Sequence, residues 1–245
     1  MANLVQLKML EDLDGFLFVD KPAGIAFSSV VKAVKRKFNL VKVGHGGSLD
    51  AAASGLFILL INDANKFVGD VMGADRAYEG VMRLGLRTNT HDIQGEPCGE
   101  GAVPEAAALR EKIAAALPEF KGDIFQTESR YCSVRKEGSA AYEIADTGEH
   151  AQFLSHVYRF TFGEPAPADR GVKLPFAVTG SKSLLVRTLV NDFGEALGTG
   201  ACLESLRRTK VGKFEVGRAI AFDKLLQVEM KDFASCVTPL GEALR

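Results

Sequence analysis

The stretch that decides the fold is Lys42-Val43-Gly44-His45-Gly46-Gly47-Ser48-Leu49-Asp50. Its glycines predict a loop whose backbone can approach a ligand where larger side chains would obstruct it. The stretch is not a Walker loop, because the closing Lys-Ser/Thr pair of that motif is missing. No GxGxxG sequence follows the first predicted strand either, so the residues give little support to a nucleotide-cofactor site.

Asp50 ends this loop and is followed by Ala51-Ala52-Ala53. By spacing alone, the favoured interpretation of Asp50 is a helix N-cap. The alternative is chemical, because no Asp or Glu occurs from Lys21 to Leu49 and Asp50 is the first acid after that basic segment. Neighbouring cations keep a carboxylate ionised and nucleophilic.

Composition limits the class of protein. The chain has 245 residues, of which 47% are hydrophobic and 25% charged, which is typical of a soluble globular protein with a full core. Its longest apolar run, 55–61, is far too short to cross a bilayer, and Glu11, Asp12 and Asp14 lie where a secretory signal would be apolar. We therefore expect a cytoplasmic protein without membrane contact.

The cysteines carry no metal or disulfide signature. Cys98, Cys132, Cys202 and Cys236 are widely separated, so the sequence shows no CxxC pair and no zinc-ligand spacing. We expect structural thiols and no bound metal.

Charge is unevenly placed, although 30 basic and 31 acidic residues give a net charge of only -1. Acids are absent from 21–49, which holds six cations, and from 170–191, which holds four. Residues 207–218 hold five cations and one acid, whereas 92–123 holds seven acids and three cations. The basic stretches predict a phosphate-binding face if they meet in space. Separate solvated faces are the equally weighted alternative, and a solvated face is favoured for 92–123.

Hydrophobic periodicity predicts interleaved helices and strands. We expect strands at 15–22, 56–61, 77–84, 131–135, 157–162 and 174–179. Helices are expected from Ser28 or Ser29 onward and at 63–72, 104–117, 183–197 and 201–208. Without a strict βαβ rhythm, this order indicates an α+β domain, and too few residues follow 226 for a second one.

Several short motifs follow one another along the chain. They are 14–24 (DGxxxxDKPxG), 42–50 (KVGHxGxLD), 74–78 (AD[KR]xY), 83–96 (RLGxxTxTxDxxGE), 181–189, 197–201 and 206–209. With these motifs the sequence resembles the TruB-type tRNA pseudouridine synthases. Each motif alone is weak, but their order and spacing together are specific. The resemblance covers residues 14–226.

The resemblance implies an α+β fold with a mixed, largely antiparallel sheet, flanking helices and a central basic cleft. It implies one catalytic domain over 1–245. In a departure from the family, we expect its common C-terminal RNA-binding extension to be absent, which leaves open a different RNA target. The implied reaction converts a uridine of RNA, typically the T-loop uridine of tRNA, into pseudouridine without a cofactor. We expect a monomer whose partner is RNA, with no protein partner.

Residue roles follow from the same resemblance. Asp50 would be the nucleophile, Arg187 would pair with it, and Tyr78 would stack on a flipped-out uracil. The remaining candidates for substrate binding are His45, Asp92, Leu185, Leu206 and Arg208, with Lys21, Lys66 and Arg207 as contacts to the RNA backbone.

Structural roles are the alternatives for several of these residues. Tyr78 could be a core tyrosine of a strand, and Arg187 a surface charge on a helix. His45 could be a hydrogen-bonded structural histidine, and Leu206 could simply pack within a helix.

The sequence also departs from the family. Leu185 replaces a tyrosine that the family places against the target base, and a leucine can neither donate a hydrogen bond nor exchange a proton. Ala51 and Glu128 stand where the family has prolines. These departures keep two alternatives open: an RNA-folding factor that has lost turnover, and a synthase that acts on another RNA.

Overall fold

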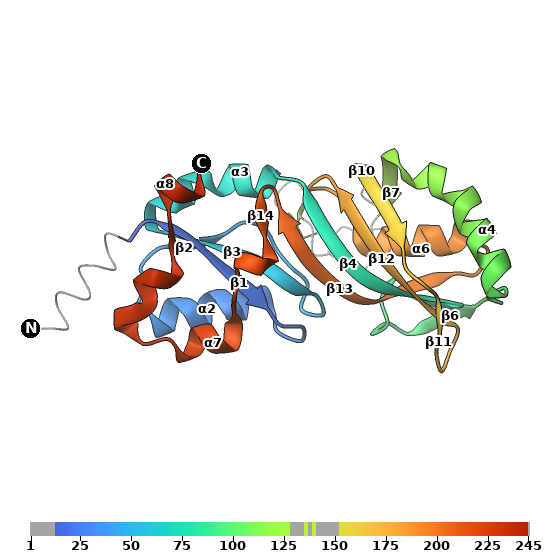
Figure 1. The fold of residues 1–245 in the computed structure, drawn as a ribbon, viewed down its shortest axis with the longest axis horizontal. Coiled ribbons are helices and arrows are strands. Elements are labelled where there is room, and N and C mark those ends of the chain that lie inside the picture. Colours follow the sequence, from blue (N-terminus) through green and yellow to red (C-terminus); the bar gives the residue numbers. More distant parts are fainter. Residues whose placement is uncertain (1–12, 128–134, 137–138, 141–151, 245) are drawn as a thin grey trace, which may run out of the picture. The chain divides into compact units, whose positions relative to one another are not determined.

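The computed structural model describes residues 13–127, 135–136, 139–140 and 152–244. The chain forms two compact units (Figure 1). The first consists of residues 1–74 and 207–245, and the second of residues 75–206. Each unit is described by itself.

The first unit is built on a mixed sheet. Strand β1 (Gly15–Lys21) runs antiparallel to β3 (Ser54–Ile61) and parallel to β15 (Ile220–Ala221). The end of β13 (Ala201–Val211) pairs in parallel with β3. Shorter antiparallel strands are β2 (Val43–His45), β14 (Phe214–Glu215) and β16 (Thr238–Pro239).

Helices flank this sheet. They are α2 (Phe27–Lys37), α3 (Val68–Gly73), α7 (Phe222–Gln227) and α8 (Leu240–Ala243), with the 3-10 helices η1 (Asn62–Phe67), η3 (Val216–Arg218) and η4 (Met230–Cys236). Helix α2 buries Val30 and Val34, and the Phe38 that follows it stacks on Phe233 with ring centroids 3.8 Å apart. The basic side of α2 is left facing solvent.

The central strands of this unit are buried on both faces. Nearly every residue of β1 and β3 is apolar and buried, which explains why both read as continuous hydrophobic runs. One face packs Phe16, Phe18, Leu56 and Ile58 around Phe214. Strand β3 directly follows the loop that ends at Asp50.

The second unit contains an antiparallel sheet in the order β13-β4-β12-β10-β7. Its strands are β4 (Arg76–Leu84), β7 (Gly122–Thr127), β10 (Gln152–Phe162) and β12 (Val172–Gly180), and the short β11 (Ala166–Pro167) pairs with β12. Two separate two-stranded sheets are formed by β5 (Leu86–Thr88) with β6 (Pro97–Glu100) and by β8 (Arg135–Lys136) with β9 (Ser139–Ala140). Its helices are α4 (Ala106–Ala116), η2 (Leu117–Phe120) and α6 (Val186–Ala196).

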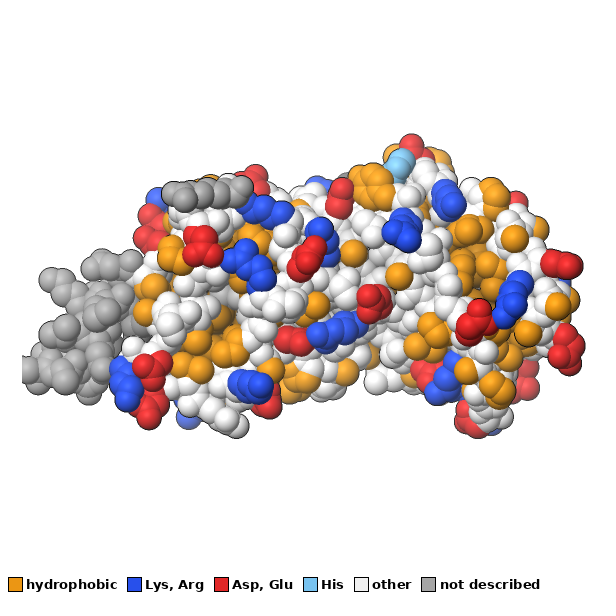
Figure 2. Space-filling view, in the orientation of Figure 1, with side chains coloured by type: hydrophobic (Ala, Val, Ile, Leu, Met, Phe, Trp, Pro, Cys, Tyr) orange, Lys and Arg blue, Asp and Glu red, His pale blue; other side chains and the backbone are white. Residues whose placement is uncertain are grey.

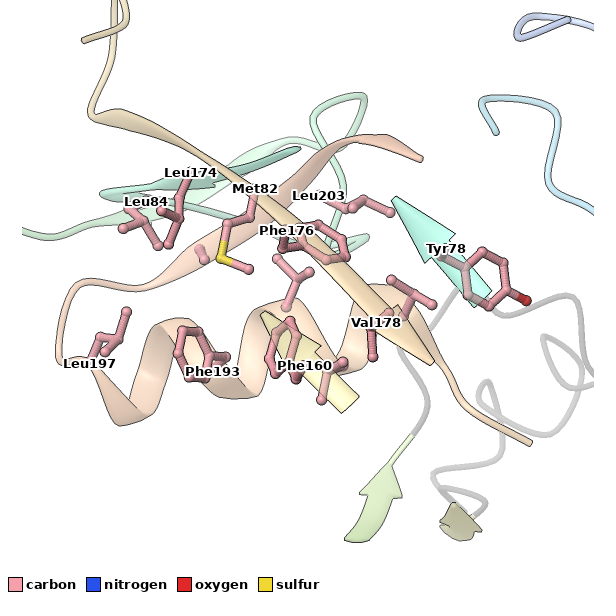
Figure 3. Close-up of a cluster of buried hydrophobic side chains, with 14 of the residues drawn as sticks. Tyr78, Met82, Leu84, Phe160, Leu174, Phe176, Val178, Phe193, Leu197 and Leu203 are labelled. Carbon is pink, nitrogen blue, oxygen red and sulfur yellow. The ribbon is translucent and has the colours of Figure 1, made fainter. Parts of the chain in front are cut away.

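Helix α6 closes the core of the second unit. Figure 3 shows α6 beside a cluster of buried side chains, with Phe193 and Leu197 pointing from the helix region toward the strands. Phe193 meets Phe160 of β10 edge-on at 5.2 Å and stacks on Phe162 at 4.9 Å. The expected α+β class, with a mixed, largely antiparallel sheet and flanking helices, is confirmed.

The helix expected at 201–208 is wrong, because this segment belongs to strand β13. Its partners are distant in sequence: Glu204 accepts a hydrogen bond from Nε of Arg83 and pairs with Lys173. Tertiary pairing therefore overrides local helix propensity here.

Three smaller expectations also differ. The predicted helix 63–72 splits into η1 and α3, because the Asn65 side chain donates to the carbonyls of Leu60 and Asn62. Helix α2 starts at Phe27 with Ala26 as its N-cap, so neither Ser28 nor Ser29 caps it. Strand β3 follows the Asp50 loop, which rules out the helix N-cap interpretation of Asp50.

The other predicted elements lie close to where they were expected, with the strand 131–135 outside the described residues except for Arg135. In the described part of the chain, none of the helices has the length and apolar character that crossing a bilayer requires.

Gly55 carries a testable constraint. Its φ is +102°, and a Cβ at this position would lie 2.2 Å from the carbonyl oxygen of Arg208. We expect Gly55→Ala to lower the free energy of unfolding by about 2 kcal/mol or more, measured by urea denaturation. Gly69→Ala is the control, since no atom lies near its added Cβ. Equal stability of the two variants would contradict the assigned constraint.

Candidate active site

The loop that carries Asp50 lies in the first unit, between β2 and β3. The amide of Gly46 donates to the Ile58 carbonyl at 2.9 Å, and the amide of Ala53 donates to the Asp50 carbonyl at 3.1 Å. A Cβ on Gly46 would lie 2.3 Å from the Val71 side chain. At Gly46, therefore, the glycine permits close packing of the loop against the protein itself rather than the close approach to a ligand that the sequence suggested.

A buried arginine holds this loop. The Arg208 side chain on β13 is almost fully buried. Its Nε donates to the Leu56 carbonyl at 2.8 Å, and its Nη1 donates to the Ser48 carbonyl at 2.8 Å. Charge-assisted hydrogen bonds to both sides of the loop fix the backbone on either side of Asp50.

A buried lysine supports the same loop. The Nζ of Lys21 donates to the carbonyls of Pro22, Ile25 and Ala51 at 2.8, 2.9 and 3.2 Å. Burial lowers the pKa of Lys21 to about 8, an effect that the Asp50 carboxylate opposes and Arg208 reinforces. Asp50 itself is half-buried. Full burial does not fit the expectation that Lys21 contacts the RNA backbone, and its bonds assign it to the loop instead.

His45 lies at the start of the loop against two aromatic rings. Its ring centroid is 5.2 Å from that of Phe27 and 6.0 Å from that of Phe57. Burial, reinforced by Arg208, lowers the pKa of His45 below its ordinary value, so the imidazole is neutral at neutral pH. Among the described residues, its buried Nδ1 has no hydrogen-bond partner.

Two of the expected contacts to the RNA backbone form ion pairs. Arg207 donates to both carboxylate oxygens of Asp20 at 2.9 and 2.7 Å, and Lys66 pairs with Asp63 at 2.6 Å. Three further cations of the 207–218 and 170–191 stretches also form ion pairs. Arg218 pairs with Glu242 and Lys173 pairs with Glu204, which lie outside these stretches, and Lys210 pairs with Glu215 of its own stretch. On the face in Figure 2, acidic and basic side chains are interspersed. Counting charges along the sequence therefore overestimates these two basic patches.

Tyr78 lies in the second unit, on β4, and is only 8% exposed. Figure 3 shows it at one end of the hydrophobic cluster, with the phenol oxygen directed away from Phe176 and Val178. Leu206 is half-buried on β13 and packs against the same cluster. An apolar ring face with an outward hydroxyl is suited to stacking on a base.

Arg187 is the second residue of α6, and its Nη1 donates to Oδ2 of Asp92 at 3.2 Å. The other carboxylate oxygen of Asp92 accepts hydrogen bonds from Thr90 Oγ1 at 2.9 Å and from the Gln94 amide at 3.0 Å. The turn holding Asp92 is fastened to β13, because Leu203 donates to the His91 carbonyl and accepts from the Ile93 amide. Asp92 thereby fixes the direction of the guanidinium.

Gln126, which the sequence reading did not select, fixes the start of α6. Its side chain is 1% exposed; its Oε1 accepts from the Leu185 amide, and its Nε2 donates to the Leu185 carbonyl, both at 3.0 Å. Leu185 is the N-cap residue of α6 and lies two residues before Arg187. The segment GDIFQT gives no sequence signal for the burial of its glutamine, because Gln is ordinarily a surface residue.

The structure thus gathers the candidate residues in two groups. Asp50, His45, Lys21, Lys66, Arg207 and Arg208 belong to the first unit, and Tyr78, Asp92, Leu185, Arg187 and Leu206 to the second. Within the groups, Lys21 and Arg208 hold the Asp50 loop, and Asp92 holds Arg187. Lys66, on η1, is largely exposed and does not belong to either set of contacts. The expected pairing of Asp50 with Arg187 stays a prediction.

Comparison with known protein families decides the ancestry. The N-terminal domain model of the TruB family pseudouridylate synthases matches residues 35–164. The model of the tRNA pseudouridylate synthase B C-terminal domain matches residues 187–245. The chain belongs to the TruB family.

Relatives in this family cover most of the chain. A tRNA pseudouridine synthase B of Stutzerimonas stutzeri (strain A1501) is 35% identical over 223 residues, which are 91% of this chain and 72% of the relative. One of Burkholderia pseudomallei (strain 668) is 40% identical over 217 residues, which are 87% of this chain and 69% of the relative.

Solved structures resemble this TruB-family chain as well. A Cbf5-Nop10-Gar1 complex contains a chain that is 26% identical, with a TM-score of 0.70. An H/ACA RNP bound to a substrate RNA containing 2′-deoxyuridine contains another, 26% identical, with a TM-score of 0.67. Both matches cover 97% of this chain, which spans 63% and 62% of those chains.

Removing the Gln126 side chain tests the anchoring of α6. We expect Gln126→Ala to lower the free energy of unfolding by about 2 to 4 kcal/mol, because two backbone groups of Leu185 lose their buried partners. Gln227→Ala, at the exposed end of α7, is the control and should change little. Urea denaturation measures both, and a Gln126→Ala protein as stable as wild type would refute the anchor.

The buried Lys21 predicts a pH dependence of stability. Below pH 8 its amine is protonated in both the folded and the unfolded chain, and the cost of burying the charge is constant. Between about 8 and the ordinary value of 10.5, the folded state binds fewer protons than the unfolded state. The free energy of unfolding of wild type, relative to Lys21→Met, should therefore rise as pH increases through this window.

Urea denaturation of both proteins from below pH 8 to about pH 10 measures this difference. Lys224→Met, which removes an exposed lysine, should show no such rise relative to wild type. A flat difference between wild type and Lys21→Met above pH 8 would rule out the lowered pKa.

Proposed function

We propose that the chain is an isomerase, an RNA pseudouridine synthase that converts a uridine of tRNA, with the T-loop uridine as its target. The observation that carries the proposal is the half-buried Asp50 at the end of a loop held by two buried cations. Family membership and the similarity to tRNA pseudouridine synthase B enzymes support the substrate class. The two units together would make up one catalytic domain.

The reaction moves the uracil without changing the atoms of the nucleotide. The Asp50 carboxylate triggers cleavage of the bond between N1 of uracil and C1′ of ribose. The detached uracil turns, and a new bond forms between C5 and C1′. The proton on C5 is then lost and N1 gains one, so that the product is an isomer of the substrate. These proton transfers need no redox cofactor.

Arg187 supports this chemistry by pairing with Asp50. A guanidinium carries five N–H donors, so its hydrogen bond to Asp92 is compatible with pairing to a second carboxylate. It also keeps its charge at any working pH. In this arrangement Asp92 positions Arg187, and Arg187 orients Asp50.

Tyr78 supports the binding of a flipped-out base. The target uracil is inaccessible within a folded RNA, and its extrusion costs a few kcal/mol, which stacking offsets in part. Leu185 can pack on the uracil but offers no hydroxyl. The Tyr78 phenol or a water molecule would therefore handle the C5 proton in this protein.

Direct assay of RNA tests the function. We expect wild type to create a new carbodiimide-dependent stop at the T-loop uridine of an unmodified tRNA transcript. Asp50→Asn should reduce the rate by at least about a thousandfold, because an amide is not a nucleophile of this kind. Asp223→Asn, on the exposed surface of α7, is the matched control and should retain activity.

An unchanged transcript with wild type would refute the proposed target. Stops in other cellular RNAs would then indicate a synthase with a different substrate. Transcript binding by wild type without any stop would instead favour an RNA-folding factor.

Removal of one oxygen separates stacking from chemistry at Tyr78. We expect Tyr78→Phe to keep KM within about threefold, since the ring still stacks, and to lower kcat by about a hundredfold, the usual range for loss of an acid–base group. Tyr158→Phe, on the exposed face of β10, should change neither constant. A normal kcat for Tyr78→Phe would assign the proton transfer to water.

A further inference from the structure

The exposed face of α2 forms a continuous polar stripe. Lys32, Lys35 and Arg36 are three and four residues apart, which places them on one side of the helix, and all three are exposed. Ser28 and Asn39 extend this side at the two ends and are exposed as well. The stripe therefore presents hydrogen-bond donors along about three turns, with three positive charges in its middle part.

Lys32, Lys35 and Arg36 differ from five other cations of the first unit, each of which pairs with a carboxylate. None of Lys32, Lys35 and Arg36 lies within ion-pair distance of a carboxylate in the part of the chain that the structure describes. The five paired cations are Lys66, Arg207, Lys210, Arg218 and Lys231. No acidic residue occurs between Lys21 and Leu49, so the sequence around the helix supplies no local counter-charge.

Three adjacent uncompensated cations repel one another and are suited to a partner with closely spaced negative charges. Successive turns of a helix are about 5 Å apart, and a nucleic acid strand carries a phosphate about every 3.4 Å of duplex axis. Lys32 and Arg36 are one turn apart and Lys35 is next to Arg36, so the three long side chains can reach neighbouring phosphates. Serine and asparagine side chains are also common donors to phosphate oxygens.

The buried side of α2 argues against a membrane as the partner. Helices that lie in a membrane interface insert an apolar face into the lipid. In α2 this face is occupied, because Val30 and Val34 are buried in the core and Phe38 stacks on Phe233. Only the polar side is left for a partner.

We propose that the exposed side of α2, formed by Ser28, Lys32, Lys35, Arg36 and Asn39, binds the phosphodiester backbone of RNA. The inference rests on the proposed function for the identity of the nucleic acid, the substrate tRNA. The contacts are to phosphates, so this surface adds affinity without reading the base sequence.

Salt dependence of binding tests this surface. The triple variant Lys32→Gln, Lys35→Gln, Arg36→Gln is compared with Arg110→Gln, Lys224→Gln, Lys231→Gln, which removes the same residue types from exposed positions elsewhere. Both sets are placed in an Asp50→Asn background, and binding of an unmodified tRNA transcript is measured at several salt concentrations. We expect the slope of log K against log salt to become shallower by about 2 to 3 for the α2 variant only.

An α2 variant whose slope matches that of the control would overturn the proposal. Loss of binding to vesicles of phosphatidylserine and phosphatidylcholine, with an unchanged slope for RNA, would overturn it in favour of a membrane surface. Pseudouridine formation by the protein with Asp50 intact is measured in parallel. Absence of product in the wild type refutes the proposed function, whereas product formation with an unchanged slope refutes only the α2 surface.

Discussion

The buried guanidinium of Arg208 is the interaction on which the Asp50 loop depends. It joins the carbonyls of Ser48 and Leu56, one on each side of Asp50, to strand β13. A buried charge is tolerated only when its donors are satisfied, so the loop and the arginine require each other. Gly55 is part of the same arrangement, since only a glycine allows the backbone to approach Arg208 this closely. The result is a half-buried carboxylate with a fixed backbone.

In the second unit, the guanidinium of Arg187 is likewise held in place by hydrogen bonding within the protein. Gln126 fixes the first residue before α6, and Asp92 fixes the guanidinium of Arg187 on its first turn. Asp92 is in turn held by Thr90 and by a turn fastened to Leu203. Both groups are therefore positioned before any substrate binds, which reduces the reorganisation that the reaction would otherwise require.

Much of the fold could be predicted from sequence, because its central elements have strong local patterns. Strands β1 and β3 are continuous apolar runs, and α6 has a clear helical periodicity. Strand β13 could not be predicted in this way. Its Glu204 and Arg208 are polar residues whose partners are far away in the sequence, so the segment has no clean alternation.

The candidate site likewise contains residues that could be predicted from the sequence and residues that could not. The motif residues Asp50, Tyr78 and Arg187 could be selected from sequence because they stand in ordered, specific patterns. The burial of Lys21 and Gln126 could not, since both are ordinarily surface residues. Charge counts were misleading for Arg207, whose partner Asp20 is distant in sequence. Lys32, Lys35 and Arg36 of α2 keep, in the described residues, the uncompensated charge that the sequence indicated.

A crystal structure of this chain bound to a T-arm stem–loop RNA is the most direct test of the central claim. It should show the target uridine outside the base stack and against Tyr78, with the Asp50 carboxylate about 3 to 3.5 Å from C1′ and Arg187 hydrogen-bonded to that carboxylate. A uridine that stays stacked within the RNA loop, or an Asp50 carboxylate that faces solvent away from the ribose and from Arg187, would contradict the account.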